Sequence, residues 1–260
     1  MAETLRQIDI GFQANLYESQ NPTRYWLHNA RREWVLSKLE SLKPNGGRYL
    51  EVGIGCGVYT EWMAGHGFVT GLDINEEFVL AANLLCNVDA RVGDITLATK
   101  NDSEFDLALC SEVIEHVVNS QAALNNMFRA LKSNGHLILT TPNRYSTMEL
   151  FARLLSFKPV ATLARLVYGE PVDDLGHVNR LTRAALRKQI ETAGFAVVER
   201  YDVALYLPVV AEFGGSVGAR VCRWGADVLR RSDFLSHLLW TQCWVLKLSL
   251  IHISEPTRPY

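Results

Sequence analysis

The sequence predicts an α/β protein in which a doubly wound, mostly parallel sheet lies between layers of helices. Two observations carry this prediction. Short apolar runs alternate with segments of helical periodicity along most of the chain. The first apolar run also enters a turn with three glycines, Gly53, Gly55 and Gly57, and two predicted strands end in an acid, Glu51 and Asp73. Acids and glycine turns at strand ends indicate a nucleoside site at one edge of the sheet.

The elements follow in a regular order. Helical periodicity over residues 25–42 ends at the Pro-Asn-Gly-Gly stretch 44–47, and the first strand covers 48–52. A helix over 58–64 leads to a strand at 68–73, and Asn75 can cap the next helix. Thr182 is the expected start of a later helix that ends at Gly194. The other predicted strands are 90–92, 105–110, 136–141 and 195–201.

The residues around the glycine turn select the ligand. A dinucleotide fingerprint needs Gly or Ala at position 58, where this chain has Val58. The carboxylate of Glu51 would repel a pyrophosphate but attract a ligand that carries an amino group and a sulfonium. S-adenosylmethionine (SAM) has this charge pattern, and Asp73 is suited to its ribose hydroxyls.

Composition sets broad bounds. The 260 residues, 48% of them hydrophobic, suffice for one sizeable domain with insertions. The net charge of −2 provides no basic field for nucleic acid, and DNA is not an expected partner. Five cysteines without a C-x-x-C pair favour a reducing, cytoplasmic location. We find no secretion signal and no apolar run of 18 residues, so no membrane span is expected.

Three stretches carry a family resemblance. Residues 50–57, with Asp73, resemble the first motif and the ribose acid of the class I SAM-dependent methyltransferases, and the likeness covers roughly residues 25–247. Residues 111–117 and 139–144 resemble the branch that contains the ubiquinone-pathway O-methyltransferases. The expected SAM contacts are Glu51, Gly53, Gly55, Gly57, Asp73, Ile74, Asp94, Ile95, Ser111 and Glu112. Asp94 lies where the family contacts adenine, and Ile95 can pack on the ring.

The resemblance implies a seven-stranded sheet with helices on both faces, in which residues 240–247 form a last, antiparallel strand between the fifth and the sixth. Residues 1–47 are then an N-terminal helical segment, and 48–247 form the SAM-binding domain, with insertions at about 145–180 and 208–239. Residues 248–260 resemble the translation of a sequencing adapter, and we expect this tail to lie outside the functional fold.

Methyl transfer to oxygen usually needs a base. His116 follows the fourth strand at the edge where open α/β sheets bind ligands, and His177 lies in the first insertion, so both are candidate bases. Each also has a structural interpretation, as a residue that packs the next helix or anchors a loop.

A metal is a further hypothesis. Glu112, Glu115 and His116 have i, i+3, i+4 spacing, so on a helix they would share one face and could bind Mg²⁺. With His177 as a fourth ligand, this set resembles that of RNA 3′-end methyltransferases. The alternative interpretation is that Glu112 contacts SAM and Glu115 is a solvated helix residue.

The insertions bear on the acceptor. Both are rich in apolar residues, and residues 218–247 contain five basic side chains against two acidic ones. Such a segment can cover the substrate pocket, contact a second subunit in a homodimer, or lie peripherally on the inner face of a membrane. We expect a SAM-dependent methyltransferase acting on a small-molecule or lipid-linked acceptor, at oxygen. RNA 3′-end methylation and a non-catalytic, SAM-binding regulatory role are the alternatives.

Overall fold

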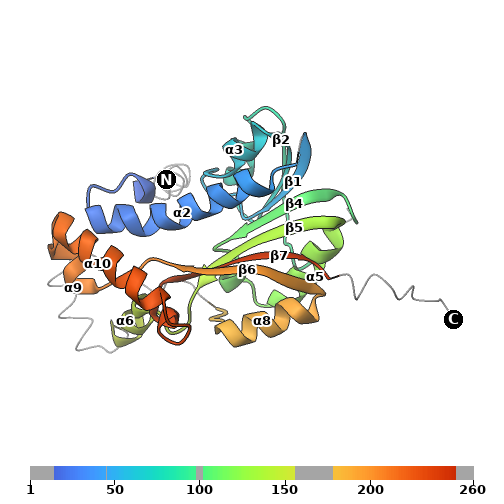
Figure 1. Ribbon diagram of the computed structural model, residues 1–260. Coiled ribbons are helices and arrows are strands. Elements are labelled where there is room, and N and C mark those ends of the chain that lie inside the picture. Colours follow the sequence, from blue (N-terminus) through green and yellow to red (C-terminus); the bar gives the residue numbers. More distant parts are fainter. Residues whose placement is uncertain (1–14, 45, 98–101, 156–177, 250–260) are drawn as a thin grey trace.

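A computed structural model of the chain describes residues 15–44, 46–97, 102–155 and 178–249 (Figure 1). One seven-stranded sheet, in the order β3-β2-β1-β4-β5-β7-β6, forms the centre of the molecule. The strands are β1 (Gly47–Val52), β2 (Gly67–Asp73), β3 (Val88–Val92), β4 (Phe105–Ser111), β5 (Leu131–Pro142), β6 (Phe195–Val203) and β7 (Thr241–Leu248). β7 is antiparallel to both of its neighbours and the other pairs are parallel, which confirms the predicted sheet.

Helices and short 3₁₀ turns connect the strands. They are α2 (Pro22–Leu42), α3 (Thr60–Ala64), α4 (Glu76–Ala82), η1 (Ile114–His116), α5 (Ser120–Ala130), α6 (Thr147–Leu155), α8 (Arg183–Thr192), α9 (Pro208–Phe213), α10 (Gly215–Arg230) and η2 (Leu235–Leu238). None of the described helices is both long and apolar enough to cross a membrane.

Side-chain caps fix where the helices begin. The side chain of Asn75 accepts a hydrogen bond at the start of α4, and that of Thr182 does the same for α8, as predicted. α2 begins three residues earlier than expected because Pro22 occupies its first turn and Asn21 accepts from the N–H groups of Thr23 and Arg24.

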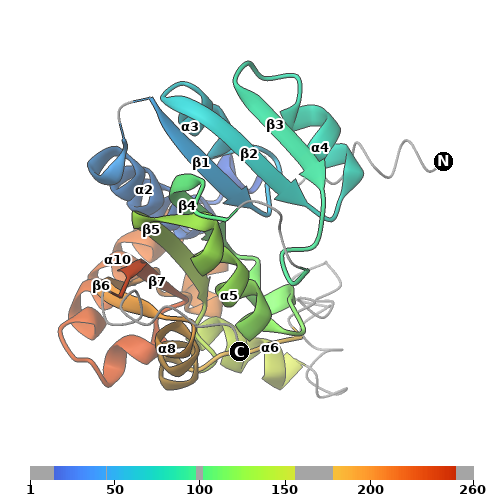
Figure 2. The ribbon, with the colours of Figure 1, turned by 90° about the vertical axis from the view of Figure 1, so that its right-hand side faces the viewer.

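The pleat of the central strands divides the core into two layers. Leu107 and Leu109 of β4 pack in the cluster that contains the apolar side chains of α2 and α3. Ala108 and Cys110, which point the other way, pack in the cluster beneath α5 and α8. Figures 1 and 2 show these two pairs of helices on opposite faces of the sheet.

The carboxyl ends of the parallel strands meet at one edge of the sheet. Val203 at the end of β6 pairs with Thr241, which also pairs with Pro142 at the end of β5. α9 and α10, which follow β6, therefore begin at this edge, and Figure 1 shows them beside the N-terminal half of α2.

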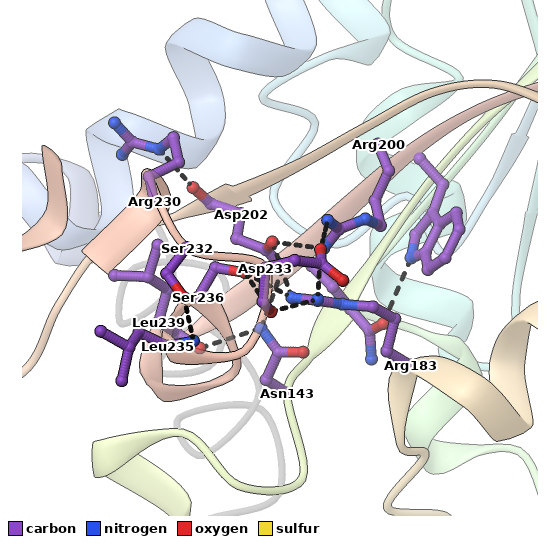
Figure 3. A network of polar contacts seen from close by, with 12 residues as sticks. Asn143, Arg183, Arg200, Asp202, Arg230, Ser232, Asp233, Leu235, Ser236 and Leu239 are labelled. Carbon is purple, nitrogen blue, oxygen red and sulfur yellow. Dashed lines mark hydrogen bonds and ion pairs between the residues drawn. The ribbon is translucent and has the colours of Figure 1, made fainter. Parts of the chain in front are cut away.

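A partly buried polar network attaches the segment after α10 to the sheet (Figure 3). Arg183 of α8 donates to Asp202 of β6 at 2.9 Å, to Asp233 at 2.9 Å and to Ser236 of η2 at 2.8 Å. Arg200 also donates to Asp202, at 2.6 Å. Because Asp202 is only 2% exposed, these contacts supply the partners that its charge needs.

β7 continues one residue beyond the expected start of the tail. Leu248 pairs with Phe195 and is buried, and the N–H of Ser249 donates to the carbonyl of Gly194 at 2.9 Å. Residues 250–260 lie outside the described part of the chain.

Candidate functional site

A cavity of about 710 Å³ opens at the carboxyl edge of the sheet. Its wall comes from the loops that follow the first four strands, at residues 52–56, 72–75, 93–96, 111–113 and 116–119. Further lining residues come from the N-terminal region, α2, residues 58–59 and α4. Four chain segments that are distant in sequence therefore surround one space, at the position where open α/β sheets bind ligands.

The loop after β1 depends on glycine. Gly53, Gly55 and Gly57 all have left-handed backbone conformations, with φ values of 78°, 53° and 77°. A Cβ atom on Gly53 would lie 2.1 Å from the side chain of Val113. The close packing of the loop therefore also requires that this position has no side chain. Gly53 and Gly55 line the cavity, whereas Gly57 stands behind it and closes the turn with a hydrogen bond to Ile54 at 3.1 Å.

Asp73 lies at the end of β2 and lines the cavity. Its carboxylate accepts from the N–H of Gly55 at 3.1 Å and from the N–H of Asn75 at 2.8 Å. These two bonds fix its orientation and join the β1 and β2 loops. Each oxygen still has capacity for a further donor, such as a ligand hydroxyl.

Glu51 lies beneath the glycine turn and is absent from the cavity wall. It is 1% exposed and accepts a hydrogen bond from the hydroxyl of Thr60 at 2.6 Å. Burial raises its pKa to about 8, against the opposing effect of the Thr60 hydrogen bond. A direct contact of Glu51 with SAM therefore stays a prediction, and the raised pKa of Glu51 keeps much of it uncharged near neutral pH.

The far end of the cavity, beyond β3, is partly apolar. Ile95 is buried and Ile74 is largely exposed, and both line the space. Asp94 accepts from the N–H of Thr96 at 2.8 Å, a bond that shapes this loop. The three predicted contacts Ile74, Asp94 and Ile95 are thus together at one end.

At the end of β4, Ser111 and Glu112 face the cavity. Glu112 has φ of 56°, a conformation that is unfavourable for a residue with a side chain. Its N–H donates to the carbonyl of Thr140 at 3.0 Å, and its carboxylate accepts from the Thr140 hydroxyl at 3.0 Å. These contacts hold the carboxylate in place at the cavity wall.

Arg31, which reaches the cavity from α2, is not among the site residues predicted from the sequence. Its guanidinium lies 2.7 Å from the carboxylate of Glu112 and donates to the hydroxyl of Tyr17 at 3.3 Å. Its Nε atom is buried, with no hydrogen-bond partner among the described residues. Arg31 stands beside Arg32 in a polar helix, so the sequence offers no signal that separates it from a solvated face.

Of the two candidate bases, the described part of the chain includes only His116. His116 ends η1, is exposed and lines the cavity. His177 lies outside the described residues, so its role stays a prediction.

The expectation that Glu112, Glu115 and His116 share one helical face is wrong. Glu112 precedes η1 in a left-handed conformation, and the 3₁₀ helix covers only Ile114–His116. Glu115 is 2% exposed and accepts from the hydroxyl of Thr141 at 2.9 Å, and burial together with the charge of Glu112 holds its pKa well above the usual range. Within the described ranges no group of three or more His, Cys, Asp or Glu side chains could hold a metal ion.

The donor set suits a nucleoside that carries positive charge. Carboxylates line the cavity in the β2 and β3 loops, at Asp73 and Asp94, and after β4, at Glu112, and Ile95 and Phe78 add apolar surface. The unpartnered Nε of Arg31 is a buried donor that an anionic ligand group can satisfy. Acidic, basic and apolar groups together fit a zwitterionic nucleoside such as SAM.

Comparison with known proteins gives a consistent result. The model of a family described as methyltransferase domain matches residues 25–200. A ubiquinone biosynthesis O-methyltransferase of Vibrio atlanticus is 31% identical over 181 residues, which cover 58% of this chain and 75% of that protein. One of Xanthomonas axonopodis pv. citri is 38% identical over 125 residues, 45% of this chain and 51% of that protein. The chain thus spans about half the length of some of these relatives and three quarters of others.

Solved structures share the fold at lower identity. An S-adenosylmethionine-dependent methyltransferase from Mesorhizobium loti matches with a TM-score of 0.55 and 16% identity, over 83% of this chain and 97% of that chain. The [4+2]-cyclase SpnF matches with a TM-score of 0.55 and 17% identity, over 85% and 82%. A fold shared with a protein named as a cyclase does not by itself define the reaction.

Proposed function

This chain belongs to the methyltransferase-domain family and is a SAM-dependent methyltransferase, and on that premise we propose that it methylates an oxygen atom of a small-molecule or lipid-linked acceptor. The names of the Vibrio and Xanthomonas relatives, which are O-methyltransferases of ubiquinone biosynthesis, support the choice of oxygen. The observation that carries the proposal is the cavity that unites the glycine turn, Asp73 and Glu112 at the carboxyl edge.

We assign the nucleoside end of SAM to the β2 and β3 loops. The free acceptor capacity of Asp73 suits the ribose hydroxyls, because both of its oxygens are already oriented by backbone N–H groups. Asp94 is placed to contact the adenine, and Ile74 and Ile95 provide apolar surface against the ring. Gly53 and Gly55 allow the ligand to approach the backbone closely.

We assign the amino-acid end of SAM to the β4 loop and α2. Glu112 and Ser111 suit the amino group, and Arg31 suits the carboxylate, since its Nε is a buried donor without a described partner. The negative charge of Glu51, beneath the turn, would favour a cationic ligand through the field it creates once ionised.

When bound, SAM supplies a methyl group attached to a sulfonium, which is transferred by in-line displacement. The chain contributes by positioning the reactants, because the cavity wall holds SAM in place while the acceptor oxygen approaches its methyl group. We assign to His116, which is exposed on the cavity wall, the removal of the proton from the acceptor hydroxyl. His177 remains a second candidate for this role.

The alternatives are less well supported. RNA 3′-end methylation was inferred from a metal-binding face of Glu112, Glu115 and His116, and that face does not form because Glu115 is buried against Thr141. A non-catalytic, SAM-binding role requires that no acceptor be methylated, which the family membership disfavours.

A label-transfer experiment tests the proposal. The purified chain is incubated with SAM labelled in its methyl group and with a lysate divided into small-molecule, lipid and RNA fractions. We expect label in a small-molecule or lipid product, with the methyl group on oxygen by NMR. Label in RNA alone, or tight SAM binding without any labelled product, would contradict the proposal.

A further inference from the structure

We infer that the exposed face of α10 is a docking surface for an anionic membrane. Val217, Val221, Trp224 and Val228 follow one another at helical intervals and therefore form one stripe along α10. All four are exposed, Trp224 to 69%. A stripe of apolar side chains that no described residue covers needs a partner.

The opposite side of α10 already has packing partners within the chain. Its buried positions are small, namely Gly218, Ala219, Cys222 and Ala226, and this side packs against α2 and α9. A Cβ atom on Gly218 would lie 2.3 Å from the carbonyl oxygen of Val210 in α9, so the helices are in close contact. The stripe therefore does not point into the core, and it is presented on a helix that is fixed in place.

Basic residues border the stripe. Arg220 and Arg231 lie on the turns beside the apolar positions, and Arg223 is next to Trp224. All three are exposed, and no described carboxylate forms an ion pair with any of them. Arg230, by contrast, pairs with Asp227 at 2.7 Å. Apolar and aromatic side chains flanked by arginines that have no carboxylate partner are typical of helices that lie in the interface of an anionic bilayer.

This charge pattern decides between the two partners that the sequence left open. A two-fold dimer through the stripe would place the same patch opposite itself and bring the arginines of both copies together. Like charges across an interface are repulsive, whereas the phosphates of anionic lipids complement them. The structure thus favours a lipid surface over a second copy.

The surface also lies at the functional end of the molecule. α10 follows the carboxyl end of β6, and the guanidinium of Arg223 stands 5.9 Å from the ring centroid of Trp26 in α2. Five residues further along α2, about 7.5 Å of helix rise, Arg31 lines the cavity. A docked α10 would hold the cavity near the bilayer. A role of this docking in delivering a lipid-linked acceptor rests on the proposed function, whereas the inference that α10 binds a membrane is independent of it.

Vesicle sedimentation tests the inference without SAM or acceptor, so its result is independent of the proposed function. The full chain should bind phosphatidylglycerol vesicles and should bind phosphatidylcholine vesicles at least tenfold more weakly. Arg220→Glu with Arg231→Glu should weaken the first interaction at least tenfold, and so should Val221→Ser with Trp224→Ser. The matched controls, Arg187→Glu on α8 and the highly exposed Leu84→Ser, should bind like the unmodified chain.

Two outcomes would overturn the inference. One is equal binding of the unmodified chain and the α10 variants to phosphatidylglycerol vesicles, with thermal melting showing that all are folded. The other is a dimer, measured by analytical ultracentrifugation, that the same α10 substitutions dissociate, because the stripe would then belong to a second copy.

Discussion

The guanidinium of Arg31 in α2 and the carboxylate of Glu112 at the end of β4 lie 2.7 Å apart and join the N-terminal helix to the wall of the cavity. Both side chains are largely buried, Arg31 at 10% and Glu112 at 18% exposure. Residues before the first strand therefore take part in the candidate site, although the sequence analysis treated them as a separate segment.

Loss of this ion pair should affect stability and ligand binding together. In Arg31→Met, Glu112 keeps its charge without a cation, so we expect the free energy of unfolding to fall by about 3 kcal/mol. SAM affinity should fall as well, which calorimetry would show. Denaturant unfolding of Arg24→Met provides the control, because Arg24 is 44% exposed and its pair with Glu212 should be worth less than about 1 kcal/mol. An Arg31→Met variant as stable as this control would refute the role given to the pair.

Glu51 should make stability depend on pH. Its pKa rises from 4.5 to about 8 on folding because burial disfavours the charged form. The folded state thus binds the proton more tightly, so this contribution is fully present below about pH 4.5 and is lost as the pH rises through 8.

Glu51→Gln tests that contribution. The variant should gain stability relative to the unmodified chain as the pH rises from 5 to about 8 in denaturant titrations. Glu115→Gln, measured in parallel, gives the separate contribution of the second buried carboxyl to the pH dependence of stability, since its pKa is raised in the same direction. A constant difference between Glu51→Gln and the unmodified chain across this range would show that Glu51 is ionised throughout.

His116 should act on turnover and not on SAM binding. If it takes the acceptor proton, His116→Gln should lower kcat by about 100-fold or more and leave the SAM dissociation constant close to unchanged. The same assay on His177→Gln separates the two candidates. Full activity of both single variants would exclude either histidine as an essential base.

The sequence predicted the parts of the site that depend on local patterns. A carboxylate at a strand end and glycines in the following turn are sufficient to recognise β1, β2 and the positions of Gly53 and Asp73. The topology of a doubly wound sheet then brings these loops to one edge. The last strand, β7, was expected from the family resemblance, which implies a final antiparallel strand and for which residues 240–247 were the candidate.

Contacts between distant segments could not be read in this way. Arg31 became part of the site only because α2 packs on the sheet, in the core cluster that contains Leu107 and Leu109 of β4, and no local pattern records this packing. Glu115 was expected on a helical face with Glu112, but the left-handed conformation at Glu112 changes the direction of the chain. The partners of Arg183 likewise come from β6 and from the segment after α10.

The Arg183 network should contribute strongly to stability. Arg183→Ala removes the cation that contacts the buried Asp202, and although Arg200 remains, we expect a loss of about 3 kcal/mol in the free energy of unfolding. Arg187→Ala is the matched control on the same helix, since its pair with Glu191 is exposed and should contribute about 0.5 kcal/mol or less. Similar denaturation midpoints for the two variants would contradict this account of the network.

Calorimetric titration of SAM into the chain and into two Asp73 variants tests most directly whether this cavity is the SAM site. Asp73→Ala should weaken binding by about 1–3 kcal/mol, because the ribose loses hydrogen bonds to a charged acceptor. Asp73→Asn should lose less, since an amide oxygen can still accept. Asp89→Ala, on β3 and outside the cavity wall, should bind SAM like the unmodified chain. Undiminished SAM affinity in both Asp73 variants, with their fold intact by thermal melting, would contradict the placement of SAM in this cavity.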